Sequence, residues 1–89
     1  MSLTNTFSAL SDENRQKILD LLKKDDLTVT EINKNLTITM ATLSHHLDIL
    51  KRSGLITSRR SGQNIIYSLN LSVFEDLSKS VIKFLSINK

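Results

Sequence analysis

Apolar residues along most of this chain recur at spacings of three and four, which places their side chains on one face of an α-helix. Leu3, Phe7 and Leu10 follow this spacing and predict a short first helix. A second helix is predicted from its apolar stripe, Ile18, Leu19, Leu21 and Leu22. Either Ser11 or Asp12 can be the N-cap of this helix, because both side chains accept hydrogen bonds from free backbone N–H groups.

A third, short helix is predicted around its two apolar residues, Ile32 and Leu36. Its N-cap is either Thr28, which forms a capping-box pattern with Glu31, or Thr30, and the pattern leaves both starts open. A polar turn follows, after which Thr39 is expected to cap a fourth helix. That helix is expected to end at Gly54, because glycine readily adopts the left-handed conformation after a helix C-terminus.

The pattern then changes to two short runs rich in β-branched residues, 55–60 and 65–69. The segment 61–64 between them contains Gly62, so these segments predict a β-hairpin. Ser72 is expected to cap a final helix, whose apolar stripe consists of Phe74, Leu77, Val81, Phe84 and Leu85. The predicted order is four helices, a hairpin and a final helix. This is the order of a winged helix-turn-helix, a mainly α fold with a small β-hairpin. Residues 1–89 are expected to form it as a single domain.

In such a fold the second helix of the pair, here the fourth helix, enters the major groove of DNA. At about 100° per residue, its inner face is expected to hold Leu43, His46, Leu47 and Leu50. The opposite face carries Ala41, His45, Asp48 and Arg52, flanked by Thr42, Ser44 and Lys51. Small, hydroxyl and imidazole side chains cover its N-terminal half, and these suit contact with base edges. Ile49 fits neither face.

The distribution of charge along the chain supports a DNA-binding surface more strongly than the net charge does. The net charge is +3, and residues 34–64 hold five Lys or Arg against one Asp or Glu, for +4. Residues 1–33 carry −2 and residues 65–89 carry +1. A basic segment on an otherwise balanced domain is typical of a nucleic-acid-binding surface, with an ordinary solvated face as the plainer alternative.

Three polar residues of the predicted hairpin suit contact with the DNA backbone. Arg59 and Arg60 end its first strand, and Gln63 lies in its turn. Arginines there contact phosphates or enter the minor groove, which contributes affinity and salt dependence more than base specificity. A hairpin that faces only solvent is the alternative.

The adjacent pair His45 and His46 does not favour a metal site, because neighbouring helical residues point about 100° apart. His46 is interpreted as a hydrogen-bonded histidine at the edge of the core, and Asp48 as a charged partner of His45. The chain shows no nucleophile with a base and an orienting carboxylate, so an enzyme is not expected.

The chain is short, with 89 residues, 39% of them apolar, and no cysteine. A domain of this size is marginally stable alone, so without disulfides or thiolate metal sites its support is expected from a second subunit. The terminal helices carry more apolar surface than one small core covers, although burial within the monomer is the alternative. The predicted dimer interface comprises Leu3, Phe7, Leu10, Phe74, Leu77, Val81, Phe84 and Leu85.

The sequence also predicts a cellular location. No apolar run reaches the roughly 18 residues of a membrane-spanning helix. Residues 1–5 lack the basic and apolar regions of a signal peptide. We therefore expect a cytoplasmic protein without stable membrane insertion.

A set of short motifs runs through nearly the whole chain. It comprises Ala9–Asp12 with Arg15 and Ile18–Leu19, then Thr39–Thr42, Ser44–Leu50, Ser53–Ile56, Arg59–Gly62 and Ile66–Leu69. These motifs, above all the order Ser-His-His-Leu, resemble the ArsR/SmtB-type winged-helix repressors. The resemblance implies a homodimeric transcriptional repressor whose first and last helices form the interface. It also implies base-reading positions at Met40, Thr42, Ser44 and His45, and wing positions at Arg59, Arg60 and Gln63.

Two features depart from the metal sensors of that family. Where metalloid sensors carry Cys-x-Cys at the start of the third helix, this chain has Thr28 and Thr30. Where zinc sensors carry Asp and His on the last helix, it has Glu75 and Asp76 but no histidine. No cofactor is therefore expected, and the chain is closer to ligand-poor members that act as autorepressors or respond to a regulatory protein partner.

Together these features predict a homodimeric repressor that binds a palindromic operator in double-stranded DNA without a thiolate metal site. The predicted DNA-binding residues are Thr39, Met40, Ala41, Thr42, Ser44, His45, Lys51, Arg52, Arg59, Arg60 and Gln63. One alternative is a winged-helix module that docks a protein partner without reading DNA, which the basic residues argue against. Another is a repressor with a non-thiolate metal site that uses His46, Asp48 or helix carboxylates.

Overall fold

The computed structural model describes the backbone of residues 3–87 and the side chains of residues 7–86. Over this range the chain is mostly helical, with a small three-stranded antiparallel sheet. The elements are α1 (Leu3–Leu10), α2 (Glu13–Lys24), β1 (Leu27–Thr28), α3 (Val29–Lys34), α4 (Met40–Arg52), β2 (Ile56–Ser61), β3 (Asn64–Leu69) and α5 (Leu71–Ile87). The predicted mainly α class with a hairpin is confirmed.

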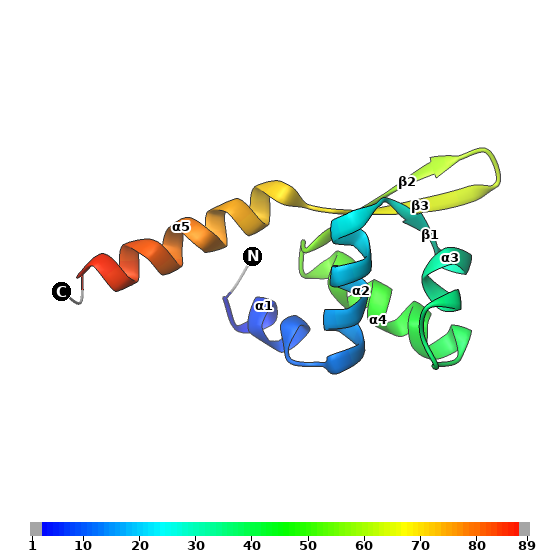
Figure 1. The fold of residues 1–89 in the computed structure, drawn as a ribbon, viewed down its shortest axis with the longest axis horizontal. Helices are drawn as coiled ribbons and strands as arrows, with labels where there is room; N and C mark the ends of the chain where they lie inside the picture. The colour runs from blue at the N-terminus through cyan, green and yellow to red at the C-terminus, as the bar shows by residue number, and fades with distance from the viewer. Residues whose placement is uncertain (1–2, 88–89) are drawn as a thin grey trace.

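The molecule is elongated, with extents of 49 × 24 × 21 Å along its principal axes. Figure 1 shows α2 and α4 in the middle, with α3 and, above it, the projecting hairpin of β2 and β3 on one side and α5 on the other. None of the helices within residues 3–87 has both the length and the apolar character needed to cross a membrane. The two projecting elements leave much of their surface open to other molecules.

Side-chain caps set the starts of α2 and α4. Asp12, rather than Ser11, caps α2 and accepts a hydrogen bond from the Arg15 N–H at 3.1 Å. Thr39 caps α4 as predicted, and its hydroxyl accepts from the Thr42 N–H at 3.1 Å. Both caps satisfy backbone donors that the first turn of a helix leaves without partners.

The structure decides between the two predicted starts of α3. Thr28 is the cap, and its hydroxyl accepts from the Glu31 N–H at 3.3 Å. In return the Thr28 N–H donates to the Glu31 carboxylate at 2.9 Å, which completes the capping box. This N–H is also the largest cause that lowers the pKa of Glu31. Thr30 lies within the helix instead.

The C-terminus of α4 is tied to the start of α5. Gly54 follows α4 with a φ of 79°, the left-handed conformation that the sequence predicted there. The side chain of Asn70 donates to the Gly54 carbonyl at 2.9 Å, and the Asn70 carbonyl accepts from the Val73 N–H at 3.1 Å. Ser72 is therefore not a cap: α5 begins before it, because the tertiary contact of Asn70 sets the start.

The predicted hairpin is confirmed, but its predicted four-residue turn is wrong. Ser61 pairs with Asn64, so the strands are longer and the turn is Gly62 and Gln63 alone. Gly62 has a φ of 61°, a conformation that glycine adopts without strain and that allows the strands to reverse in two residues.

A third strand was missed by the sequence analysis. β1 pairs with β3 in the order β1-β3-β2, with Leu27 opposite Tyr67 and Thr28 opposite Ile66. Two residues are too few to show an alternation of apolar and polar positions. The strand exists because α2 and α3 place these residues beside the hairpin, and no local pattern could reveal that.

The core lies between α2, α3, α4 and the sheet. Its buried apolar residues are Ala9, Ile18, Leu19, Leu22, Ile32, Leu43, Leu47, Leu50, Leu55 and Ile56. Val73, Phe74 and Leu77 of α5 pack partly against it, whereas Val81 is 57% exposed. Thus only the first part of the described length of α5 helps to cover this core.

Candidate nucleic-acid interface

The structure confirms the two predicted faces of α4. Leu43, His46, Leu47 and Leu50 are buried. The residues of the predicted reading surface on and beside α4 are exposed, namely Thr39, Met40, Ala41, Thr42, Ser44, His45, Lys51 and Arg52. The Thr39 hydroxyl donates to the Thr42 hydroxyl at 3.0 Å, so the cap also orients a predicted base-contacting group. Core packing therefore sets the rotation of α4 and leaves its N-terminal outer half open.

His46 belongs to a polar cluster at the junction of three helices. Its Nδ1 lies 3.4 Å from Arg15 Nη1, and its Nε2 lies 3.8 Å from Asp12 Oδ1. Arg15 also donates to the carbonyls of Ala9 at 2.8 Å and Ser8 at 2.9 Å, near the C-terminus of α1. The expectation of a hydrogen-bonded histidine at the edge of the core is confirmed, and the cluster connects α1 and α2 to α4.

The same cluster acts on the Asp12 carboxyl. The Arg15 N–H that donates to it lowers the pKa of Asp12 below its ordinary value of 3.8, against a smaller opposing effect of burial. The nearby charges of His46 and Arg15 lower this pKa further. Asp12 is thus held as a carboxylate, the form that best caps α2 and attracts the Arg15 guanidinium.

Asp48 pairs with a different residue from the one predicted. Its Oδ2 lies 3.0 Å from Arg52 Nη2, four residues further along α4, rather than beside His45. This spacing brings side chains together on one face of a helix, and arginine is fully charged at neutral pH whereas histidine is not. Asp48 is therefore not the partner of the His45 imidazole, and it forms an exposed ion pair with Arg52.

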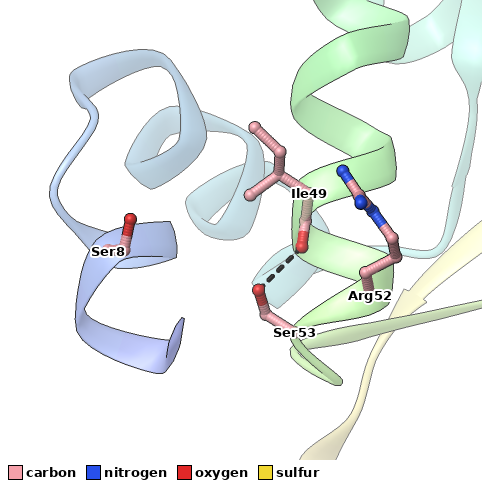
Figure 2. A pocket seen from close by; sticks show the side chains of 4 residues that line it. All are labelled: Ser8, Ile49, Arg52 and Ser53. Carbon is pink, nitrogen blue, oxygen red and sulfur yellow. Dashed lines mark hydrogen bonds between the residues drawn. The ribbon is translucent and has the colours of Figure 1, made fainter. Parts of the chain in front are cut away.

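Ile49, which fits neither predicted face of α4, lies in the last two turns of that helix, and its side chain points toward α1. Figure 2 shows it beside Ser8, Arg52 and Ser53, which with it line a cavity of about 230 Å³. The Ser53 hydroxyl donates to the Ile49 carbonyl at 2.7 Å, so it is satisfied within its own helix. The cavity separates the end of α1 from α4, and the Arg15 cluster crosses that junction.

The three predicted wing residues, Arg59, Arg60 and Gln63, are exposed on the hairpin. Arg59 is nevertheless held in place: its Nη1 donates to Asp26 Oδ2 at 3.2 Å and to Ser68 Oγ at 3.1 Å. Arg60 projects beyond the core, opposite Ile65, which is 42% exposed. Lys51 and Arg52, at the C-terminal end of α4, are exposed as well.

The predicted dimer residues divide into two groups. Phe7, Val81, Phe84 and Leu85 are exposed, at 64%, 57%, 65% and 60% of their surface. Leu10, Phe74 and Leu77 pack partly against the core, so burial within the monomer accounts for part of their apolar surface. The Leu3 side chain lies outside the described side chains. The exposed group leaves apolar surface on α1 and on α5 that the described part of the chain does not cover.

Two residues of the site gained their roles only from the structure. Arg15 was noted as part of a motif, and its position three residues before Ile18 on α2 was a signal that it borders the apolar stripe. Asp26 carried no such signal, because its partner Arg59 is 33 residues away in the chain.

Residues 12–58 match the model of the arsR family of bacterial regulatory proteins. The chain belongs to the arsR family. It is 43% identical over 84 residues to the transcriptional repressor SdpR of Bacillus subtilis (strain 168), covering 94% of this chain and 93% of that protein. The arsR-family chain is thus a transcriptional regulator with a DNA-binding winged helix-turn-helix.

Solved structures of arsR-family regulators share this fold. An ArsR-like transcriptional regulator from Rhodococcus sp. RHA1 has a TM-score of 0.87 at 26% identity, over 94% of this chain and 77% of that chain. A homodimeric winged helix-turn-helix DNA-binding domain from Mycobacterium bovis has a TM-score of 0.74 at 26% identity, over 98% and 83% of the two chains. The predicted fold and family are confirmed.

The positions where metalloid sensors of the arsR family carry a Cys-x-Cys pair hold threonines in this regulator. Thr28 is one of these threonines, and its hydroxyl is used to cap α3. His46 is buried and Asp48 is exposed on α4, so the fold does not bring these two together as a non-thiolate set. Across the described part of the chain, no three His, Asp or Glu side chains gather to hold a metal ion.

Proposed function

We propose that this arsR-family regulator is a homodimeric repressor that binds a palindromic operator in double-stranded DNA. The exposed N-terminal half of α4 carries the proposal, because its rotation is set by the buried Leu43, His46 and Leu47. Ala41 and Thr42 are small enough for the helix backbone to approach bases, and Ser44 and His45 can donate or accept hydrogen bonds at base edges. The similarity to the repressor SdpR supports repression rather than activation.

The wing and the C-terminal turn of α4 supply contacts with the DNA backbone. Lys51 and Arg52 lie at the end of α4, and Arg59, Arg60 and Gln63 lie on the hairpin, all exposed. Cationic side chains that neutralise phosphates release counterions, which gives affinity at low salt with little dependence on base sequence. In the proposal, α4 therefore determines which DNA is bound and the wing increases how tightly.

The exposed apolar residues of the terminal helices support dimerisation. Phe7, Val81, Phe84 and Leu85 would be covered by the same residues of a second copy, as a twofold axis requires. The related Mycobacterium bovis domain is described as homodimeric. A twofold dimer presents two α4 helices to half-sites about one helical turn, roughly 34 Å, apart on a palindrome.

The proposal includes no thiolate effector, since the chain has no cysteine. A signal other than a thiolate-bound metal must then release the DNA, and a regulatory protein partner is our expectation. Titration with zinc and then with a chelator tests whether a metal ion releases the DNA. We expect unchanged DNA affinity in both, and a shift on adding zinc would show a non-thiolate effector site.

Selection of bound duplexes from a random pool, followed by gel shifts at two salt concentrations, tests the proposed function. We expect a palindrome with half-sites one helical turn apart and a Kd of about 10⁻⁸ M or tighter at about 0.1 M salt. Equal affinity for the selected duplex and for a scrambled duplex of the same composition would overturn it. Enrichment of a single half-site would overturn the dimeric part alone.

A further inference from the structure

Arg59 lies on the outer face of the sheet, away from the core. Residues directly opposite each other in antiparallel strands share a face, and successive residues alternate between faces. Ser58 is opposite Tyr67, which packs against the core, so this pair faces inward. Arg59 is the next residue, opposite Ile66, and therefore points outward.

From that face the Arg59 guanidinium reaches across the whole sheet. Its Nη1 donates to Ser68 Oγ in β3 at 3.1 Å and to Asp26 Oδ2, just before β1, at 3.2 Å. Arg60 follows Arg59 in β2 and points to the other face, opposite Ile65. The two wing arginines, equivalent in the sequence, thus have opposite orientations, and Arg59 is in an ion pair before any DNA arrives.

We propose that Asp26 competes with DNA phosphates for the Arg59 guanidinium, and that Asp26 thereby lowers the DNA affinity of the wing. The inference rests on the proposed function, because it concerns how the wing contacts DNA. The pair is exposed, with 58% of the Arg59 side chain and 47% of the Asp26 side chain accessible. A phosphate can therefore reach Arg59 without opening the core.

The magnitudes decide the outcome of this competition. An exposed ion pair changes an equilibrium constant by at most about fivefold. A guanidinium can grip a phosphate with two parallel hydrogen bonds, and every further phosphate contact adds counterion release. DNA therefore displaces Asp26, and the carboxylate tunes the affinity of the wing rather than blocking it.

The chain contains a matched control for this effect. Asp25 is adjacent to Asp26 and carries the same side chain, and it is exposed. Its side chain enters no hydrogen bond or salt bridge described for residues 7–86. D25N therefore removes the same negative charge from almost the same place, but leaves the Asp26–Arg59 contact intact.

The test compares the full-length D26N, D25N, R59A, R59A/D26N and R59A/D25N proteins with the wild type. Each is titrated onto a labelled random-sequence duplex of about 20 base pairs at several salt concentrations between about 0.05 and 0.2 M. We expect D26N to bind about two- to fivefold more tightly than D25N for each wing engaged. In D26N, Arg59 does not have to break an ion pair with the residue 26 side chain before it contacts a phosphate. This advantage should shrink as salt screens the pair, and it should vanish in the R59A background.

Three results would overturn the inference: equal affinities of D26N and D25N, an advantage of D26N that persists without Arg59, or weaker binding by D26N. The last would show that Asp26 orients Arg59 toward DNA instead of competing for it. Thermal unfolding of each variant checks that the differences arise in binding. Failure of the wild type to bind any duplex would overturn the proposed function itself, and this inference with it.

Discussion

The guanidinium of Arg15 lies between the C-terminus of α1 and the inner face of α4. It donates to the carbonyls of Ser8 and Ala9 and faces Nδ1 of His46. Ala9 is fully buried, and a buried carbonyl without a partner is costly. The Arg15 side chain thus connects α1, which carries part of the proposed dimer interface, to α4, which carries the proposed DNA-reading surface.

Truncation of Arg15 should therefore destabilise the fold. We expect R15A to lower the free energy of unfolding by about 2 kcal/mol, because several hydrogen bonds at the junction are lost together. Urea denaturation at one fixed protein concentration measures the change. K17A is the control, since Lys17 forms an exposed ion pair with Glu13 at 3.4 Å on the same helix, and should change it by less than about 0.5 kcal/mol. Equal losses in the two variants would contradict the role of Arg15.

Asp12 should give part of the stability a defined pH dependence. Its folded pKa is lowered below 3.8 because it accepts the Arg15 N–H, so its carboxylate stabilises the fold above that pH. This contribution is lost as the pH falls through the folded pKa. We expect the difference in unfolding free energy between wild type and D12N to shrink as the pH falls from about 5 toward 3. Glu31 affects both proteins alike, so a difference that stays constant to pH 3 would contradict the assignment.

At the scale of elements, α4 and the hairpin are held in different ways. Four buried side chains set the rotation of α4, namely Leu43, His46, Leu47 and Leu50. The hairpin is held by its pairing with β1 and by the contact of Arg59 with Asp26 and Ser68. A rigidly oriented helix suits base reading, which needs fixed geometry, whereas contact with phosphates tolerates a less constrained element.

Substitutions in the two elements should thus have separable effects on DNA binding. H45A should change the ranking of duplex sequences, whereas R60A should weaken binding to all of them and reduce the salt slope by about one for each wing engaged. Titrations of the selected and scrambled duplexes at several salt concentrations measure both. K83A removes one positive charge from α5 and should leave the ranking and the slope unchanged. The same uniform loss from H45A and R60A would refute this division of roles.

At the scale of the whole molecule, the terminal helices determine whether a single chain can bury its own apolar surface. Leu10, Phe74 and Leu77 pack against the core, but Phe84 is 65% exposed on the projecting part of α5. Full burial of such a side chain contributes about 1.5–3 kcal/mol. A second copy that covered this surface would add this burial to the stability of a small domain.

F84S should consequently weaken the dimer. We expect its dissociation constant to rise at least about tenfold, since a symmetric interface loses the contact twice. Sedimentation equilibrium measures the constant, and affinity for a palindrome should fall with it. K79S, a polar exchange at an exposed position of the same helix, is the control. A wild-type chain that is monomeric at high concentration, or an F84S protein that dimerises like K79S, would contradict the interface.

Local features of this protein could be predicted because their causes lie within a few residues. The cap at Thr39, the left-handed Gly54 and the two faces of α4 each depend on residues within about two helical turns, and the pattern limited the cap of α2 to Ser11 or Asp12. Where two local patterns competed, as for Thr28 and Thr30, the sequence named both and the completed capping box chose one.

The sequence by itself thus determined the order of the helices and the hairpin, the rotation of α4 and the residues exposed on it, because periodicity and capping act over short distances. Tertiary structure alone decided β1, the start of α5 and the partners of Arg15 and Arg59. The contacts of Asn70, Arg15 and Arg59 with Gly54, His46 and Asp26 span 16, 31 and 33 residues. Such pairs form only after the helices and the hairpin have packed, because no local pattern encodes which distant segments will meet.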